Sequence, residues 1–263
     1  METSRLYKYT VPDSPQVCEE VERLEWGHWG NAMCSNYQPV TRSDRLLAYF
    51  GVERARDEPP HDVFPLGLAP FIRKAPTGEG RVAEDGCFGL VPHFRKELQF
   101  GRRTYNARSE TVAQLPSFRT SWKKGMRCIV PAEAIYEPNY ESGKSVRWRI
   151  ALPNHTPMGI AGIYWPWRAP DGRELFTFAM LTVNADGHPV MQRFHRPEDE
   201  KRMVVILHPE DYDRWLACDV EEAAGFLKRW EGALEASPQP LPPRAPRAVS
   251  GRVVRPPEGP ERG

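Results

Sequence analysis

The chain has 263 residues and a formal net charge of +1 at pH 7, and 40% of its residues are hydrophobic and 11% aromatic. These values are typical of a soluble globular protein with one large domain or two small ones. No run approaches the roughly eighteen uncharged apolar residues that a membrane span requires. Residues 1–32 carry charges where a signal peptide has an apolar core. We therefore expect a cytoplasmic protein that does not bind a membrane.

Residues 1–32 are acidic on balance, with six acidic and three basic side chains, and Met33 and Cys34 follow directly. If translation begins at Met1, Cys34 is an internal residue. If translation begins at Met33 and that methionine is removed, Cys34 is the N-terminal residue. The two forms differ chemically, because only an N-terminal cysteine has a free α-amine next to its thiol.

The cysteines are odd in number, widely spaced, and form no Cys-x-x-Cys pair. They are Cys18, Cys34, Cys87, Cys128 and Cys218. This pattern predicts reduced thiols, and it favours neither a disulfide framework nor a zinc ribbon.

The predicted secondary structure begins with a helix in "RSDRLLAYFGV", residues 42–52, where Ser43 is a candidate N-cap before an apolar face. Between about residues 80 and 207 the signals of strands dominate. The segments are short, rich in β-branched or aromatic residues, and separated by Gly, Pro, Asn and Asp. They are "MRCIVPAEAIYEP", "SVRWRIALPN", "MGIAGIYWPW", "ELFTFAMLTVNAD" and "KRMVVIL". We expect an α+β fold, with a mixed, largely antiparallel β-rich core and flanking helices.

The C-terminal part of the chain changes character at Ser237. The preceding segment, "HPEDYDRWLACDVEEAAGFLKRWEGALEA", predicts one or two amphipathic helices that start near Pro209. Its expected inward-facing residues are Trp215, Phe226, Leu227 and Trp230. Residues 237–263 contain eight prolines, five arginines and no aromatic residue. Such a composition cannot bury enough apolar surface to offset chain entropy, so we predict a disordered tail.

The most basic segment is residues 95–127, with nine Lys or Arg against two Glu. Phe94 lies just before this segment, and further aromatic residues are interleaved with its charges, at Phe100, Tyr105, Phe118 and Trp122. Basic and aromatic residues alternate in this way in grooves that bind single-stranded nucleic acid. An equally good interpretation is a solvated surface whose aromatic rings point into the core.

Within this segment "NARSET" places Asn106, Arg108 and Glu110 at alternating positions. An extended backbone would present all three side chains on one face, as a polar cluster. The alternative is a helix-starting turn whose side chains satisfy only their own backbone.

Two further residues are candidates for proton transfer. Glu137 ends an apolar strand directly before Pro138, where partial desolvation would raise its pKa toward that of a useful acid or base. Glu133 is the competing carboxylate. His195 lies in a polar turn, and an unperturbed imidazole titrates near neutrality, although a loop histidine is often structural.

Five segments, in this order, resemble the SRAP family, the SOS-response-associated peptidases, known as abasic site processing proteins. They are "MCSNYQP" for Met-Cys-Gly-Arg, "FGLVPHF" for Trp-Gly-Leu-Val-Pro, "NARSET", "AEAIYEP" for the Gly-Phe-Tyr-Glu-Trp type motif, and "FHRPEDEKRMVVIL" for His-x-Arg-Met-Pro-x-Ile-Leu. The chain departs from the family at Ser35 and Asn36, which replace Gly-Arg, at Phe88 and Pro138, which replace Trp, and in extra residues between His195 and Arg202.

The resemblance implies a single SRAP-type domain over residues 33–236, with a basic groove leading to the cysteine. Residues 1–32 would then be an extension that lies upstream of the true start or is removed. It also implies covalent capture of the sugar aldehyde of an abasic site in single-stranded DNA, through a thiazolidine ring on Cys34. Self-cleavage before Cys34 and a weak strand-cleaving lyase activity are further expectations.

The site residues carry roles by the same resemblance. Cys34 is the nucleophile, Asn106 orients the amine and the sugar, Glu137 is the acid/base, and His195 assists proton transfer. Arg108 and Arg202 would hold the phosphates that flank the lesion. Arg102, Arg103 and Trp122 would contribute to the DNA-binding surface.

The resemblance implies no metal and no cofactor, and we expect a monomer that is nucleoid-associated if its source is a bacterium. Two other functions remain open from the residues alone. One is a cysteine hydrolase acting on peptide or acyl substrates, with Cys34 and His195 as its reactive pair. The other is a non-catalytic module that binds single-stranded DNA.

Overall fold

The computed structural model describes residues 36–55 and 57–241, and its centre is a ring of five strands. Each strand of the ring pairs with the next, and the last pairs with the first, so the sheet closes on itself. In order around the ring they are β2 (Leu68–Lys74), β3 (Arg81–Phe88), β8 (Glu174–Asn184), β7 (Met158–Arg168) and β5 (Arg127–Asn139). Only the pair of β3 with β8 is parallel within this ring.

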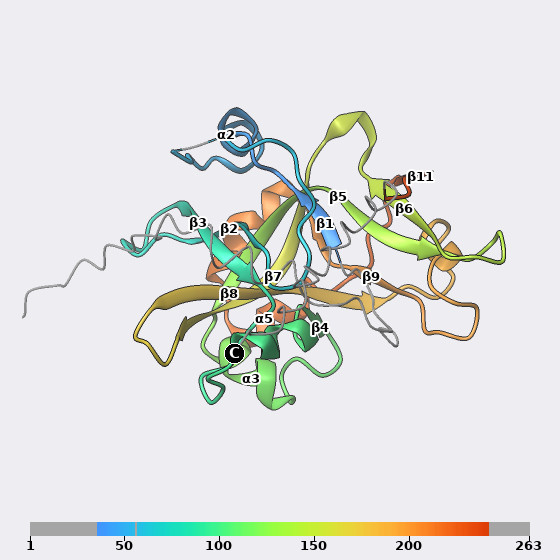
Figure 1. Ribbon diagram of the computed structural model, residues 1–263. Coiled ribbons are helices and arrows are strands. Elements are labelled where there is room, and N and C mark those ends of the chain that lie inside the picture. Colours follow the sequence, from blue (N-terminus) through green and yellow to red (C-terminus); the bar gives the residue numbers. More distant parts are fainter. Residues whose placement is uncertain (1–35, 56, 242–263) are drawn as a thin grey trace, which may run out of the picture.

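Strands β5 and β8 are longer than the ring needs, and their free halves carry additional strands. Beyond Ala132, β5 pairs with β1 (Asn36–Pro39) and with β6 (Val146–Ala151), and β11 (Glu235–Pro238) pairs with β6. The C-terminal end of β8 pairs with β4 (Asn106–Arg108) and β9 (Arg202–Val204), and β10 (Ile206–Leu207) pairs with β7. Figure 1 shows β8 as the long strand that crosses the molecule.

The helices are short and lie around this sheet (Figure 1). The α-helices are α2 (Ser43–Phe50), α3 (Pro116–Lys123), α4 (Tyr212–Ala217) and α5 (Val220–Ala224); the 3-10 helices are η1 (Leu98–Arg103), η2 (Pro153–His155), η3 (Met191–Arg193) and η4 (Pro209–Asp211). None of the helices in residues 36–55 and 57–241 is long and apolar enough to cross a membrane. The predicted α+β fold with a mixed, sheet-rich core is confirmed.

Aromatic side chains fill the interior of the ring. Phe71, Phe88 and Phe178 are fully buried, and the ring centroids of Phe71 and Phe88 each lie 5.6 Å from that of Phe178. Gly86 makes this packing possible, because a Cβ atom there would lie 2.9 Å from the ring of Phe71. The close contact explains a glycine in the middle of a strand.

Several predicted details of the elements are corrected. The helix at residues 42–52 forms as α2, but Ser43 is its first helical residue and not its cap. The carboxylate of Asp57 accepts the hydrogen bond of the Ser43 backbone N–H at 2.6 Å, which satisfies a donor that a capping side chain would otherwise take. The predicted tail boundary at Ser237 falls inside β11, whose residues pair with β6, so the folded part reaches at least Pro238.

The C-terminal helices form where they are predicted. Trp215 of α4 is fully buried, and Phe226, Leu227 and Trp230 pack against the core from the segment after α5. Helix α3 and strand β2 are not among the predicted elements.

We predict that Phe178→Ala lowers the free energy of unfolding by about 3 to 5 kcal/mol, because the cavity inside the ring cannot collapse between paired strands. Urea denaturation followed by circular dichroism measures the change. Leu47→Ala, at a side chain that is 54% exposed, is the control and should cost less than about 0.5 kcal/mol. Equal losses for the two variants would contradict the placement of Phe178 inside the ring.

Candidate functional site

A buried carboxylate and a buried imidazole meet at the C-terminal end of β5. The side chains of Glu137 and His195 are 1% and 5% exposed, and Glu137 Oε2 lies 3.7 Å from His195 Nε2. Glu137 pairs with Trp148 of β6, and the ring of Trp148 contacts Phe194, the neighbour of His195, at 6.0 Å between centroids. Strand pairing and aromatic packing therefore hold the two groups together and exclude water from between them.

The backbone of His195 is fixed by the same strand end. Its N–H donates to the carbonyl of Pro138 at 2.9 Å, and Asn139 forms a β-bridge with Phe194. His195 has a φ of 63°, in the left-handed region that few residues other than glycine adopt. Burial disfavours the charged ring and lowers the pKa of His195 below its ordinary value. The imidazole is therefore poised as a neutral proton acceptor next to Glu137.

The start of β1 lies beside this pair. Asn36 is 5% exposed and pairs with Tyr136, the neighbour of Glu137. Arg147 fixes this corner: its guanidinium stacks on Tyr136 at 3.3 Å from the ring centroid and forms an ion pair with Asp62. With its amide oriented to satisfy both groups, Asn36 accepts a hydrogen bond from Arg147 Nη2 at 2.7 Å. The predicted nucleophile Cys34 precedes Asn36 and lies outside the described residues, as do Met33 and residues 1–32.

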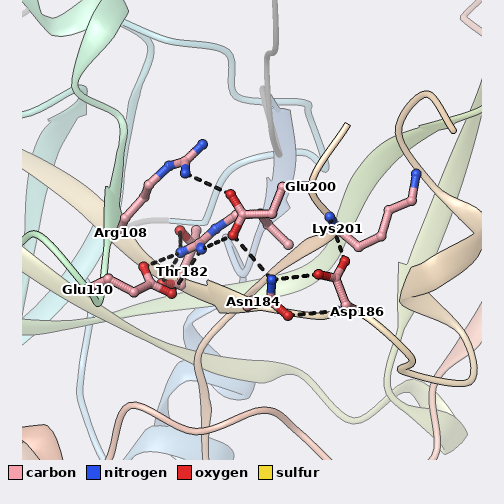
Figure 2. A network of polar contacts seen from close by, with 8 residues as sticks. Arg108, Glu110, Thr182, Asn184, Asp186, Glu200 and Lys201 are labelled. Carbon is pink, nitrogen blue, oxygen red and sulfur yellow. Dashed lines mark hydrogen bonds and ion pairs between the residues drawn. The ribbon is translucent and has the colours of Figure 1, made fainter. Parts of the chain in front are cut away.

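A second polar cluster is built on the C-terminal end of β8 (Figure 2). Arg108 of β4 pairs with Thr182 on one edge of β8, and Arg202 of β9 pairs with Asn184 on the other. Because directly paired and alternate residues share a face, the four side chains project to the same side of the sheet. We call the group formed by Arg108, Glu110, Thr182, Asn184, Asp186, Glu200, Lys201 and Arg202 the arginine–carboxylate network.

Arg202 is the buried centre of the arginine–carboxylate network. It is 1% exposed, and its two terminal nitrogens donate to both oxygens of Glu110 at 2.9 Å and to Glu200 at 2.8 Å. Its Nη2 also donates to the backbone oxygen of Thr182 at 2.8 Å. The contact of Arg202 with phosphates stays a prediction; in this structure its guanidinium is buried and already neutralised by carboxylates.

Arg108 occupies the exposed rim of the arginine–carboxylate network. Its Nη1 donates to Glu200 Oε2 at 2.7 Å, and the two side chains are 47% and 37% exposed. Partial burial would raise the pKa of Glu200, but hydrogen bonds from Arg202 and Asn184 outweigh it and hold that pKa below its ordinary value. Glu200 is therefore ionised at neutral pH. The alternation predicted for "NARSET" is observed at Asn106 and Arg108, which both lie in β4, and Glu110 follows in a turn.

The other predicted DNA-binding residues lie elsewhere. Trp122, on helix α3, is 3% exposed and packs against Arg127 and Trp215 in the core, so it does not lie on the surface where it was predicted to contact DNA. Arg102 donates to Gln99 at 2.7 Å, and Arg103 is exposed on η1.

The sequence prediction missed Glu200. The sequence does contain a signal for it. When the motif His-x-Arg-Met is aligned on Arg202 and Met203, Glu200 occupies the position of the histidine. His195, which lies further upstream, nevertheless reaches Glu137. The extra residues between His195 and Arg202 thus separate the imidazole of His195 from the arginine of the motif in the sequence.

Two further observations limit the site. Within residues 36–55 and 57–241, no group of three or more His, Cys, Asp or Glu side chains could hold a metal ion. A groove of about 990 Å³ runs from Ser109 and Glu110 to Trp230, and neither Glu137 nor His195 lines it.

The comparison with protein families matches residues 33–239 to the model described as SOS response associated peptidase (SRAP). Among curated proteins, the chain is 28% identical over 191 residues to the abasic site processing protein YoqW of Bacillus subtilis, covering 70% of this chain and 80% of YoqW. It is 32% identical over 195 residues to YoaM of the same organism, covering 70% of this chain and 79% of YoaM. The match to HMCES of Gallus gallus is 31% identical but covers 40% of this chain and 38% of HMCES.

Solved structures show the same fold. A crystal structure of a protein from Bordetella bronchiseptica superimposes with a TM-score of 0.73 and 37% identity, covering 79% of this chain and 100% of that chain. A protein from Bacteroides thetaiotaomicron superimposes with a TM-score of 0.67 and 23% identity, covering 78% and 91%, and supports the fold alone.

We predict that His195 makes the protein less stable as the pH falls. The pKa of His195 is lowered in the folded state. The contribution of the neutral imidazole to the free energy of unfolding is therefore complete above about pH 6.5 and is lost as the pH falls through the folded-state pKa. Protonation of His195 lowers the free energy of unfolding by at most about 1.4 kcal/mol per pH unit, the value for one proton.

Urea denaturation between pH 7.5 and 5 measures this dependence. The slope should be shallower in His195→Asn, since asparagine tolerates the left-handed backbone. His61→Asn, at an exposed histidine, is the matched control for the same substitution outside the site. A slope that His195→Asn leaves unchanged would contradict the assignment.

Proposed function

The chain belongs to the SRAP family, and from this premise we propose that it processes abasic sites in single-stranded DNA by bonding to them through Cys34. The product is a thiazolidine that joins the α-amine and the thiol of Cys34 to the aldehyde carbon of the opened sugar. The names of YoqW, YoaM and HMCES, all abasic site processing proteins, support the substrate class.

The observation that carries the proposal is the position of Glu137 and His195 relative to the start of β1. Asn36 lies opposite Tyr136, one residue from Glu137 on β5. Cys34 lies outside the described residues and precedes Asn36 by two residues in the sequence. The proposal assigns it to the buried pair because β1 begins beside the strand end that carries Glu137.

The chemistry uses both functional groups of an N-terminal cysteine. The α-amine attacks the aldehyde carbon, the carbinolamine loses water, and a Schiff base forms. The thiolate then attacks the imine carbon and the nitrogen takes up a proton, which closes the five-membered ring. A free α-amine titrates at about 7.7 to 8.0 and a free thiol at about 8.5, so both are partly reactive at cellular pH.

Glu137 and His195 supply the proton transfers in this sequence. A carboxyl group at Glu137 protonates the departing hydroxyl of the carbinolamine, and the resulting carboxylate receives the proton that the amine releases. The neutral imidazole of His195 accepts a proton from the thiol or the sugar hydroxyl. Their burial strengthens both interactions, because the local dielectric is low.

The mechanism requires that Cys34 have a free amine. An internal cysteine has an amide nitrogen, whose lone pair is delocalised into the carbonyl and cannot attack the aldehyde. Translation from Met33 followed by removal of the methionine gives the free amine, and we favour it; hydrolysis of the peptide bond before Cys34 by the protein itself is the alternative. The Schiff base also permits β-elimination of the 3′ phosphate, so weak strand cleavage accompanies capture.

The DNA backbone is held by exposed cations. Arg108 projects from β4 with 47% of its side chain exposed, and Arg103 is exposed on η1. Arginines contact phosphates without reading the base sequence, which suits a protein that recognises a lesion without a base.

We predict that protein beginning at Cys34 forms a covalent band with an abasic single-stranded oligonucleotide on a denaturing gel, and that Cys34→Ala loses it. Alanine keeps the amine but cannot close the ring, so its Schiff base hydrolyses during denaturation. Cys218→Ala, at a buried thiol of the core, is the matched control and should keep the band. A full band from Cys34→Ala, or from protein whose intact mass includes Met1, would refute the proposal.

We further predict that Glu137→Gln slows crosslinking by about 100-fold or more, the range for loss of a general acid or base. Glu133→Gln removes the other carboxylate of β5, which pairs with Arg45 at 2.7 Å, and should change the rate less than about threefold. Quenched-flow sampling of the covalent band measures both rates. The assignment of Glu137 fails if Glu133→Gln is the slower variant.

A further inference from the structure

We propose that the carboxylate of Glu200 competes with nucleic-acid phosphates for Arg108: it occupies Arg108 in the free protein and is displaced when a strand binds. This inference rests on the proposed function, because it assumes that Arg108 contacts the DNA backbone. It assigns Glu200 as a residue that sets the affinity for the strand without taking part in the chemistry.

In the described part of the chain, Glu200 is an exchangeable partner of Arg108. Within residues 36–55 and 57–241, Glu200 is the group whose hydrogen bond to the Arg108 side chain the structure defines, at 2.7 Å from Nη1. Both side chains lie partly in solvent, at 47% and 37% exposure. Figure 2 shows the Glu200 carboxylate between Arg108 and Asn184. A phosphate approaching Arg108 from solvent therefore meets a carboxylate already in the position it would take.

The remaining donors around Glu200 keep other acceptors when it leaves. Arg202 retains both oxygens of Glu110 at 2.9 Å. Asn184 retains Asp186, to which its Nδ2 donates at 2.9 Å. Displacement of Glu200 thus costs these groups one acceptor each and leaves neither without a partner, whereas it frees a guanidinium nitrogen of Arg108.

The charges of the arginine–carboxylate network make this exchange necessary. Its basic members are Arg108, Lys201 and Arg202, and its acidic members are Glu110, Asp186 and Glu200, so the charges balance (Figure 2). A backbone phosphodiester carries one negative charge, so a phosphate added without displacement would give the balanced network a net negative charge. When the Glu200 side chain rotates into solvent, the phosphate takes the place of its carboxylate at Arg108. The phosphate is an anion of similar hydrogen-bonding geometry.

Glu200 should therefore affect the binding of the strand and not the rate of the chemical step. Glu200 weakens the binding of any single strand, damaged or undamaged, because each must displace it. Once a strand is bound, Glu200 no longer contacts Arg108, and the crosslinking rate at saturating strand depends on Cys34, Glu137 and His195. Neutralising Glu200 should therefore change affinity and leave the saturated rate unaltered.

The test measures binding of an undamaged fluorescent single-stranded oligonucleotide by anisotropy across a series of salt concentrations. Glu200→Gln should tighten binding about two- to fivefold at about 0.1 M salt, in proportion to the strength of an exposed ion pair. The slope of log affinity against log salt should change by less than about 0.7, the value for one phosphate contact on a single strand, because Arg108 contacts a phosphate in both proteins. The crosslinking rate at saturating abasic strand should stay within about twofold of wild type.

Glu174→Gln is the matched control, since Glu174 forms an exposed ion pair with Arg168 at the other end of β8 and its loss changes the net charge equally. In an Arg108→Gln background, Glu200→Gln should give no gain. An equal gain from Glu174→Gln, or a gain that survives Arg108→Gln, would overturn the inference and leave the proposed function intact. Absence of strand binding in every variant would instead refute the proposed function and this inference together.

Discussion

The hydrogen bonding of β5 is the constraint on which the rest of the structure depends. Its 13 residues serve two parts of one sheet: residues up to Ala132 close the ring through β7, and the later residues pair with β1 and β6. A strand that is fixed at both halves cannot slip in register, and a slip of one residue would turn Glu137 to the opposite face. The ring thus sets the position of the site, although no residue of the site lies inside it.

The protein buries charge in two different ways, and the difference separates structure from function. Arg202 is buried with carboxylate and carbonyl oxygens that accept hydrogen bonds from both of its terminal nitrogens, and these bonds join β8, β9 and the turn after β4. Glu137 and His195 are buried side by side at 3.7 Å, an arrangement whose charge state responds to a proton. A guanidinium that carboxylates neutralise joins parts of the fold, whereas a buried acid and a buried imidazole side by side can move protons.

The sequence predicted much of this arrangement because its signals are local. The strands β5, β7 and β8 are continuous β-branched and aromatic runs, and Glu137 is marked by its place between such a run and a proline. Helix α3 was missed because its charges hide the pattern, although Pro116 at its first position and the four-residue spacing of Phe118 and Trp122 are helical signals. That spacing also explains why Trp122 lies in the core. Arg202 and Glu110 are 92 residues apart, and such a pair has no local signal.

The segment between His195 and Arg202 is held independently at its two ends. His195 is bonded to the end of β5, while Arg202 is paired with Asn184 of β8. A change in the number of residues between these two fixed ends alters the path of the loop and displaces neither end. Related chains can therefore differ in length here and keep the same acid–imidazole pair. Residues 196–199 consequently offer a position where a reporter group or an inserted peptide could be attached beside the site without disturbing its geometry.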